Sequence, residues 1–401
     1  MQSPTTSAAG TLGWNQRAQA QWMRGERQAA IDSVLAVINQ YQRPKPLKLV
    51  LQLAYYVFLC GDPRGAAVFL EDTRRDYPDD ADLLLNLSVC LSRSGQYEPA
   101  VARMRECLRS RPDDPVAYDG LAASLYQLGR HEEAAQAGTR ALVLKDSAIA
   151  PPPPDWRLPA ASPRQWPGLA GKRDVVSFSL WGRKQRYLRG ALENALAAPT
   201  LYPGWTFVFF VDESVPEETR QTLSRLGAEL RQQPADQPMR DRLAWRFQVA
   251  NEPDVGRFLV RDVDSVVSER ERSAVDAWLR SDCWFHAMRD WWTHTDLLLA
   301  GMWGGVAGVL PDLRDLLANY RPAAMETPNV DQWFLRDRVW SYVRTSCLVH
   351  DRCFSPPGAV PWPQPPTQGF HVGQNEFAVR RHEQEQRIAT VLGTKGKVRA
   401  G

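Results

Sequence analysis

The stretch Arg257-Phe-Leu-Val-Arg-Asp-Val-Asp-Ser265 sets the organisation of this chain. Phe258 to Val260 form an apolar run that is typical of a buried strand. The run ends in Asp262 and Asp264, and an i, i+2 spacing at a strand end aims both carboxylates the same way. Two hard oxygen ligands in that arrangement suit a divalent cation that also holds a diphosphate. Turns and helix caps produce the same Asp-x-Asp pattern, so the surrounding chain decides between a metal site and a structural turn.

Alternating strands and helices lead up to this stretch. We expect strands at 174–180, 207–211 and, briefly, 228–231, with helices from the first strand to about 196 and at 216–226 and 240–250. This alternation predicts a mostly parallel sheet with right-handed crossovers. Ligands of such sheets bind beyond the carboxyl ends of the strands. Trp181, Gly182 and Asp212 fall at such ends, as do the two aspartates.

Further elements follow Ser265. Ser268 and Glu271 form a capping box for a helix through about 279, and a strand at 284–288 ends at Arg289-Asp290. A glycine-rich segment, Gly301-Met-Trp-Gly-Gly305, comes next. The domain closes with two more elements, Asp331-Gln332 at the start of a helix and Gly369-Phe-His371-Val-Gly373.

The first third of the chain is a repeat. Glycine, leucine and alanine recur together at intervals of 34 residues, at Gly61, Gly95 and Gly129, at Leu53, Leu87 and Leu121, and at Ala66, Ala100 and Ala134. This is the tetratricopeptide pattern of two helices around a glycine-marked turn. It places repeats at 47–80, 81–114 and 115–148, with a degenerate unit at about 11–46. Such solenoids commonly bind peptides on their concave face, although the repeats can equally form a packing platform or a dimer surface.

A proline-rich segment separates the two regions. Pro151 to Pro154 run together, and further prolines follow to residue 167. Proline fixes φ and removes a hydrogen-bond donor, so we expect an extended, semi-rigid connector. The predicted fold class is α + α/β, in four parts: helical repeats at 11–148, a linker at 149–172, a mixed α/β domain at 173–378 and a polar tail at 379–401.

Composition excludes several classes of function. Hydrophobic residues make up 44% of the chain, charged residues 24%, and the net charge is +3. These values predict neither a nucleic-acid-binding protein nor a membrane-surface protein. The chain has no apolar run of membrane-spanning length and no signal-peptide pattern at residues 1–10, and its six cysteines lack Cys-x-x-Cys spacing. We therefore expect a cytoplasmic protein with reduced thiols.

The second region, over about 172–378, resembles the GT-A glycosyltransferases, which use nucleotide-sugar donors. The resemblance rests on the strand-terminal Asp-x-Asp, the glycine-rich segment after it, the Asp-Gln pair and the late His-x-Gly. It implies that Asp262, Asp264 and His371 hold Mn²⁺ or Mg²⁺ against the donor diphosphate, and imidazole beside carboxylates suits manganese. Gly373 is followed by Gln374, where related enzymes often carry a phosphate-binding lysine.

The same resemblance implies further site residues. Ser179, Leu180 and Trp181 would receive the nucleotide base, Asp212 would lie near the uracil or ribose, and Arg246 would meet phosphate. Trp303 and Gly304 would lie against the donor sugar. Asp331 and Gln332 would contact the sugar as well. In an inverting reaction Asp331 or Asp290 would be the base for the acceptor hydroxyl.

The function predicted is transfer of a sugar, most simply from a UDP-sugar, to a protein or peptide acceptor recruited by the repeats. A polysaccharide or lipid-linked glycan is the alternative acceptor. Two other classes stay open: a non-catalytic scaffold, and a nucleotidyltransferase, for which Trp181-Gly182-Arg-Lys184 is a poor phosphate loop. The sequence leaves open the donor sugar, the stereochemical outcome, the choice of base and the oligomeric state.

Overall fold

The computed structural model describes residues 13–322 and 329–375 and divides the chain into two compact units. The first unit is residues 1–148 with two short later segments, one of which is Cys353–Pro356. The second unit holds most of the remaining chain, from Ile149 onward. The predicted polar tail at 379–401 lies outside the described residues. The fold class is α + α/β, with a helical region followed by a mixed sheet covered by helices.

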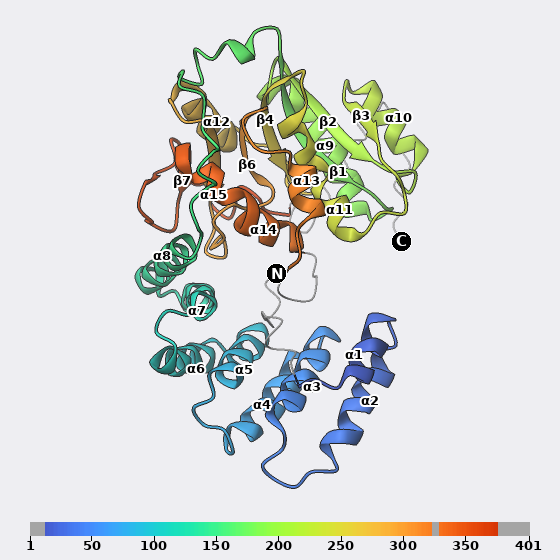
Figure 1. Ribbon diagram of the computed structural model, residues 1–401, viewed down its shortest axis with the longest axis vertical. Helices are drawn as coiled ribbons and strands as arrows, with labels where there is room; N and C mark the ends of the chain where they lie inside the picture. Colours follow the sequence, from blue (N-terminus) through green and yellow to red (C-terminus); the bar gives the residue numbers. More distant parts are fainter. Residues whose placement is uncertain (1–12, 323–328, 376–401) are drawn as a thin grey trace. The chain divides into compact units, whose positions relative to one another are not determined.

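The described residues of the first unit form four helix pairs that follow one another along the chain (Figure 1). Their bounds are α1 (Gln16–Met23), α2 (Arg27–Ile38), α3 (Leu47–Leu59), α4 (Pro63–Arg74), α5 (Ala81–Arg93), α6 (Tyr97–Ser110), α7 (Pro115–Gln127) and α8 (His131–Ser147). The turn glycines Gly61, Gly95 and Gly129 have φ of 93°, 80° and 73°, a conformation that side chains disfavour. Ala66, Ala100 and Ala134 are at most 1% exposed, so neighbouring helices approach closely at these positions.

The segment Cys353–Pro356 packs on the last of these helices. Phe354 is 3% exposed, and its ring lies so close to Gly138 of α8 that a Cβ there would be 2.1 Å from it. The backbone N–H of Ser355 donates to Thr139 Oγ1 at 3.0 Å. Gly138 is therefore a contact glycine, which the repeat pattern alone does not reveal.

The second unit is built on an eight-stranded sheet in the order β3-β2-β1-β4-β6-β5-β7-β8. The strands are β1 (Arg173–Leu180), β2 (Trp205–Val211), β3 (Glu229–Gln232), β4 (Val255–Arg261), β5 (Phe285–Arg289), β6 (Met302–Val306), β7 (Cys347–Asp351) and β8 (Ala359–Val360). β6 is antiparallel to both of its neighbours, and the other pairs are parallel. Strand order reverses at β1, which has β2 on one side and β4 on the other, and ligands of open α/β sheets bind beside such a reversal.

Helices connect and cover these strands (Figure 1). They are α9 (Gln185–Leu201), α10 (Glu217–Arg225), α11 (Met239–Ala244), α12 (Glu269–Arg280), α13 (Leu313–Ala318), α14 (Val330–Phe334) and α15 (Trp340–Val343), with a 3-10 helix at Trp245–Asn251. Ser268 caps α12 as predicted, by accepting from the Glu271 N–H at 3.2 Å. Glu271 does not return the bond in the described contacts. Its carboxylate instead accepts from Arg261 and Tyr202.

The proline-rich linker is packed rather than free. Trp156 donates through Nε1 to the Val309 carbonyl at 3.0 Å and lies edge-on to Tyr342. Trp166 packs edge-on to Trp284, with ring centroids 5.4 Å apart. The tryptophans therefore attach the predicted semi-rigid connector to the second unit.

Candidate functional site

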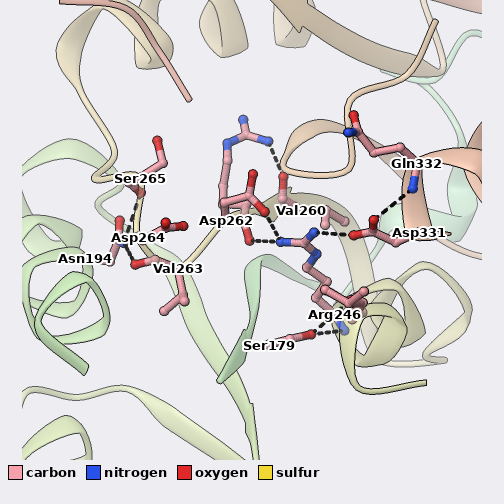
Figure 2. Close-up of polar contacts among 12 residues, drawn as sticks. Ser179, Asn194, Arg246, Val260, Asp262, Val263, Asp264, Ser265, Asp331 and Gln332 are labelled. Atoms are coloured by element: carbon pink, nitrogen blue, oxygen red, sulfur yellow. Dashed lines mark hydrogen bonds and ion pairs between the residues drawn. The ribbon is translucent and has the colours of Figure 1, made fainter. Parts of the chain in front are cut away.

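The loop after β4 presents Asp262 and Asp264 at the carboxyl end of the sheet, beside β1 (Figure 2). Asn194 of α9 holds this loop, since its amide donates to the carbonyls of Val263 and Ser265 and its Oδ1 accepts from the Val267 N–H at 3.0 Å. Gly190, one turn earlier, meets the same loop, where a Cβ would lie 2.1 Å from the Val263 carbonyl. The strand end is thus anchored on both sides of Val263, which fixes the two aspartates that flank it.

Each aspartate is paired with an arginine. Arg246 donates through Nη1 to Asp262 Oδ1, and Arg186 of α9 forms an ion pair with Asp264 Oδ2, with a 2.8 Å bond from Nε. The Asp262 side chain is 43% exposed, whereas that of Asp264 is 12% exposed. Burial raises the pKa of Asp264, and the neighbouring Asp262 raises it further because two negative charges repel. The two carboxylates are therefore close enough to influence each other.

Arg246 also joins Asp262 to Asp331 (Figure 2). Its Nη2 donates to Asp331 Oδ2 at 3.0 Å, and its Nη1 bonds the Arg261 carbonyl at 3.0 Å. Asp331 Oδ1 accepts from the Gln332 N–H at 2.9 Å. Burial raises the pKa of Asp331 to about 6, although Arg246 pulls in the opposite direction. Asp331 is thus a buried carboxyl group whose proton affinity is greater than usual.

Gly301 packs directly against the Asp262 carboxylate. A Cβ on Gly301 would lie 2.2 Å from Asp262 Oδ2, the oxygen that does not accept from Arg246. Gly304, which was predicted to approach a ligand, instead makes room inside the sheet, because a Cβ there would lie 2.3 Å from the Phe258 carbonyl. Trp303 is fully buried against Phe258 and cannot cover a sugar from this position. Of the glycine-rich segment, only Gly301 borders the aspartates.

Asp290 has a complete set of partners. Its carboxylate accepts from Arg270 at 2.8 and 3.2 Å and from the Val372 N–H at 2.9 Å, and the residue is fully buried. Its backbone N–H donates to His294 Nδ1 at 3.0 Å. A carboxylate held in this way orders its surroundings and is not open to an acceptor hydroxyl, so the structure disfavours Asp290 as the base.

His371 lies with Asp290 rather than with the paired aspartates. Its ring stacks on Trp291, with centroids 4.5 Å apart, and Nδ1 lies 3.0 Å from the Val372 carbonyl. Burial lowers the pKa of His371. In the described ranges, 13–322 and 329–375, no three His, Cys, Asp or Glu side chains gather as a metal centre. The predicted three-residue site is therefore corrected, and His371 is not part of it.

The remaining aspartate pair fits a cation that is shared with a ligand. Mg²⁺ is typically bound by one or two carboxylates together with substrate phosphates and water. The contacts of Asp262 and Asp264 described above involve one oxygen of each, and the Asp262 side chain is 43% exposed. The two side chains can contribute two ligands of such a cation but do not form a complete protein cage.

The loops after β1 and β2 lie at the same edge and are joined. Ser214 accepts from the Gly182 N–H at 2.7 Å and hydrogen-bonds Asp212. Asp212 is fully buried, with Arg242 Nη2 3.7 Å from its Oδ2. Trp181 is half-buried and lies edge-on to Trp245.

Two of the predicted base-binding residues are structural. Ser179 is 5% exposed, and its Oγ accepts from the Arg246 N–H and contacts the Leu243 carbonyl, while Leu180 is fully buried. The structure therefore corrects both predictions and leaves Trp181, of these three residues, open to a ligand.

Sequence reasoning missed Arg186, Asn194, Ser214 and Arg270. Arg186 and Asn194 lie 78 and 69 to 71 residues from their partners in the β4 loop, so spacing alone does not link them. Arg186 follows the Trp181-Gly182-Arg-Lys184 segment, and its basic character was the available signal.

Comparisons with known proteins bear on the first unit. A family model described as tetratricopeptide repeat matches residues 60–125. The structure titled "Crystal structure of MamA" is 17% identical, covers 33% of this chain and 76% of its own, and has a TM-score of 0.31. A MamA fragment from Desulfovibrio magneticus RS-1 is 17% identical, covers 33% of this chain and 75% of its own, and has a TM-score of 0.31. The structure titled "Crystal structure of YrrB: a TPR protein with an unusual peptide-binding site" is 13% identical, covers 33% of this chain and 66% of its own, and has a TM-score of 0.30.

No curated protein matches the chain. In the described parts of the chain, no helix combines the length and apolarity that crossing a membrane requires. From the family match, the N-terminal region of this protein carries tetratricopeptide repeats.

Proposed function

We propose that residues 173–378 form a metal-dependent glycosyltransferase domain of the GT-A type and that the tetratricopeptide repeats recruit a protein or peptide acceptor. One observation carries this proposal. Asp262 and Asp264 lie together at the carboxyl end of β4, beside the reversal of strand order, and the Asp262 side chain is 43% exposed. This edge is where open α/β sheets bind ligands, and paired carboxylates suit a cation that carries a diphosphate.

Asp262 and Asp264 would hold Mn²⁺ or Mg²⁺, which when bound would neutralise the charge of the donor diphosphate. Arg186 is 43% exposed and pairs with Asp264, so it is placed to meet a phosphate bound there. Arg246 is 4% exposed and bonded on both sides. It would act on the phosphates through Asp262 rather than by contact, which changes the role that the sequence suggested.

The nucleotide of the donor, a UDP-sugar in this proposal, would lie over the joined loops after β1 and β2. Trp181 offers an aromatic surface there, and aromatic faces stack on bases. Because Asp212 is fully buried, its influence on a ribose would pass through Ser214, which it hydrogen-bonds, or through Arg242.

Asp331 is buried and paired with an arginine, as Asp290 is, but its raised pKa makes it the better candidate for a base in an inverting reaction. Its pKa of about 6 lies near the pH at which proton transfer is most efficient, and it neighbours the proposed cation site through Arg246. Gln332, the next residue, is half-buried and would face the donor sugar.

A non-catalytic scaffold is the second candidate. The pairing of both aspartates with arginines, and the lack of a three-residue metal group in the described residues, favour it. Sugar transfer to a polysaccharide or a lipid-linked glycan would use the same cation site, and so would a nucleotidyltransferase reaction.

Thermal unfolding in the presence of nucleotide sugars separates these candidates. A glycosyltransferase is expected to be stabilised by one class of nucleotide sugar only when Mn²⁺ or Mg²⁺ is present, because a ligand that binds the folded state raises its unfolding temperature. A nucleotidyltransferase would respond to nucleoside triphosphates instead. A scaffold would respond to neither, and that result would reject the proposal.

A further inference from the structure

One guanidinium group serves two carboxylates that have different predicted roles. Arg246 gives Nη1 to Asp262, the proposed cation ligand, and Nη2 to Asp331, at 3.0 Å (Figure 2). These carboxylates lie 16 and 85 residues along the chain from the arginine, so the fold brings them together.

The arginine is fixed in place by its own backbone. Ser177 Oγ donates to the Arg246 carbonyl at 2.9 Å, and the Arg246 N–H donates to Ser179 Oγ at 3.1 Å. Its side chain is 5% exposed, and Nη1 also donates to the Arg261 carbonyl. The guanidinium can therefore pair more strongly with one of the two carboxylates and more weakly with the other, but it stays buried between them.

The two carboxylates differ in access. The side chain of Asp262 is 43% exposed, whereas that of Asp331 is 5% exposed. A divalent cation that arrives from solvent can reach Asp262 directly and compete there with Arg246. It cannot compete in the same way at Asp331.

We infer that Arg246 is a positioning residue that links cation binding at Asp262 to the placement of Asp331 and of α14, on which Asp331 lies. A cation on Asp262 takes over that carboxylate and repels the guanidinium, so Arg246 pairs more strongly with Asp331. By thermodynamic linkage, the Arg246–Asp331 ion pair strengthens cation binding at Asp262 by the same free energy by which the cation strengthens that ion pair. The inference rests on the proposed function because it takes Asp262 as a cation ligand.

Arg186 supplies a control within the same site. It pairs with Asp264, the other proposed ligand, but it is 43% exposed and its described contacts do not include Asp331. Replacing Arg186 with lysine alters the guanidinium pairing next to the proposed cation without altering the bridge to Asp331.

The test is a double-mutant cycle read by Mn²⁺ binding, with free Mn²⁺ measured by electron paramagnetic resonance on the full chain. Asp331→Asn is expected to weaken Mn²⁺ binding about fivefold or more, because Arg246 then competes fully for Asp262. Lysine keeps the charge but lacks the planar fork that serves two carboxylates. In the Arg246→Lys background, Asp331→Asn should therefore weaken Mn²⁺ binding by less than about twofold. The difference between the two backgrounds is the coupling energy that the double-mutant cycle measures. In the Arg186→Lys background the effect of Asp331→Asn should persist.

An equal effect of Asp331→Asn in the wild-type, Arg246→Lys and Arg186→Lys backgrounds would overturn the inference. It would show that the charge of Asp331 attracts the cation directly and not through Arg246. Absence of Mn²⁺ binding to the wild-type chain at pH 7.5 to 8 is a different failure, and it would reject the proposed function itself.

A second measurement covers the case in which the Arg246→Lys chain does not fold. Hydrogen exchange of wild-type residues 330–334 should slow when Mn²⁺ saturates the protein, because the Gln332 N–H is bonded to Asp331 Oδ1. Saturating Mn²⁺ that leaves exchange in this segment unchanged would contradict the link. The Asp331→Asn chain should show little of this protection.

Discussion

Arg246 and Asp331 form an ion pair of 3.0 Å in which each side chain is only 5% exposed. Removing one partner of a buried pair leaves an uncompensated charge, which costs roughly 3–5 kcal/mol of the free energy of unfolding. Arg246→Met should therefore destabilise the second unit by about that amount. The double variant Arg246→Met/Asp331→Leu should recover much of the loss, since neither charge remains. Urea unfolding followed by tryptophan fluorescence measures both, and a double variant as unstable as the single one would contradict the account.

Gly301 lets the Asp262 carboxylate pack against the backbone, where a side chain would displace it. In Gly301→Ala the new methyl group would lie 2.2 Å from Asp262 Oδ2, so the carboxylate must turn away from the proposed cation position. Nucleotide binding in Mn²⁺ should weaken by about tenfold or more, equivalent to about 1.4 kcal/mol. Calorimetry measures the change. Gly256→Ala is the matched control, because its Cβ would lie 3.3 Å from the nearest side chains and far along β4 from the aspartates. Equal effects of the two substitutions would show that Gly301 acts only through stability.

A buried histidine pair predicts a loss of stability in acid. His286 and His350 lie on the adjacent strands β5 and β7, with Nε2 and Nδ1 3.3 Å apart and exposures of 0% and 2%. Burial lowers the pKa of His350 to about 4 and that of His286 well below its usual value. The unfolded chain therefore binds protons at a higher pH than the folded chain does. The contribution of these histidines to the free energy of unfolding is fully present above about pH 6.5 and is lost as pH decreases toward 4.

The size of this effect for His350 is about 1.4 kcal/mol per unit of pKa shift, or roughly 3 kcal/mol in all. Urea unfolding at pH 7.5 and pH 5 captures about 2 kcal/mol of it, because pH 5 lies about 1.5 units below the pKa of histidine in the unfolded chain. His350→Leu should reduce the difference between the two pH values, whereas His131→Gln, at an exposed position in the repeats, should not. A His350→Leu chain with the full wild-type pH dependence would assign the effect to other groups.

Because Gly138 contacts Phe354, we expect Gly138→Ala to lower stability although alanine has the higher helix propensity. Alanine is the better helix former by about 1 kcal/mol, yet in Gly138→Ala the Cβ would lie 2.1 Å from the Phe354 ring. Overpacking of this kind costs roughly 1–3 kcal/mol, so the variant should be less stable. Phe354→Ala added to it should cost less than Phe354→Ala alone. Gly120→Ala is the control, because the atoms it meets belong to the flexible end of Met104.

Much of the fold follows from spacing in the sequence. The interval of 34 residues predicts the repeats because the turn glycines need positive φ and the alanines need close helix contact, and both are local requirements. The strands at β1, β2 and β4 are apolar runs that are buried on both faces of a mostly parallel sheet. β6 escaped prediction because Gly304 and Gly305 lack the branched or aromatic side chains that are typical of strands, whereas they serve close packing against β4 and β5.

The site was predicted less completely. Asp262 and Asp264 are visible because their spacing has a geometric meaning at a strand end. Their arginine partners lie far along the chain, and the direction of a side chain such as Trp303 depends on strand pairing that no local pattern records. Asp290 and His371 carry the residue types of a catalytic site, yet hydrogen bonds and stacking occupy them.

The most direct test of the central claim is a calorimetric titration with UDP, with Mn²⁺ or with a chelator, of the wild-type chain and Asp264→Asn. Asp282→Asn is the matched control, since Asp282 is 68% exposed, pairs with Arg164 at 3.0 Å and precedes β5 at the opposite end of the sheet. The account predicts binding that needs Mn²⁺ in the wild type and Asp282→Asn, and affinity at least about tenfold lower, or 1.4 kcal/mol, in Asp264→Asn. Binding that is the same with chelator, or unchanged in Asp264→Asn, would show that these carboxylates serve only the structure.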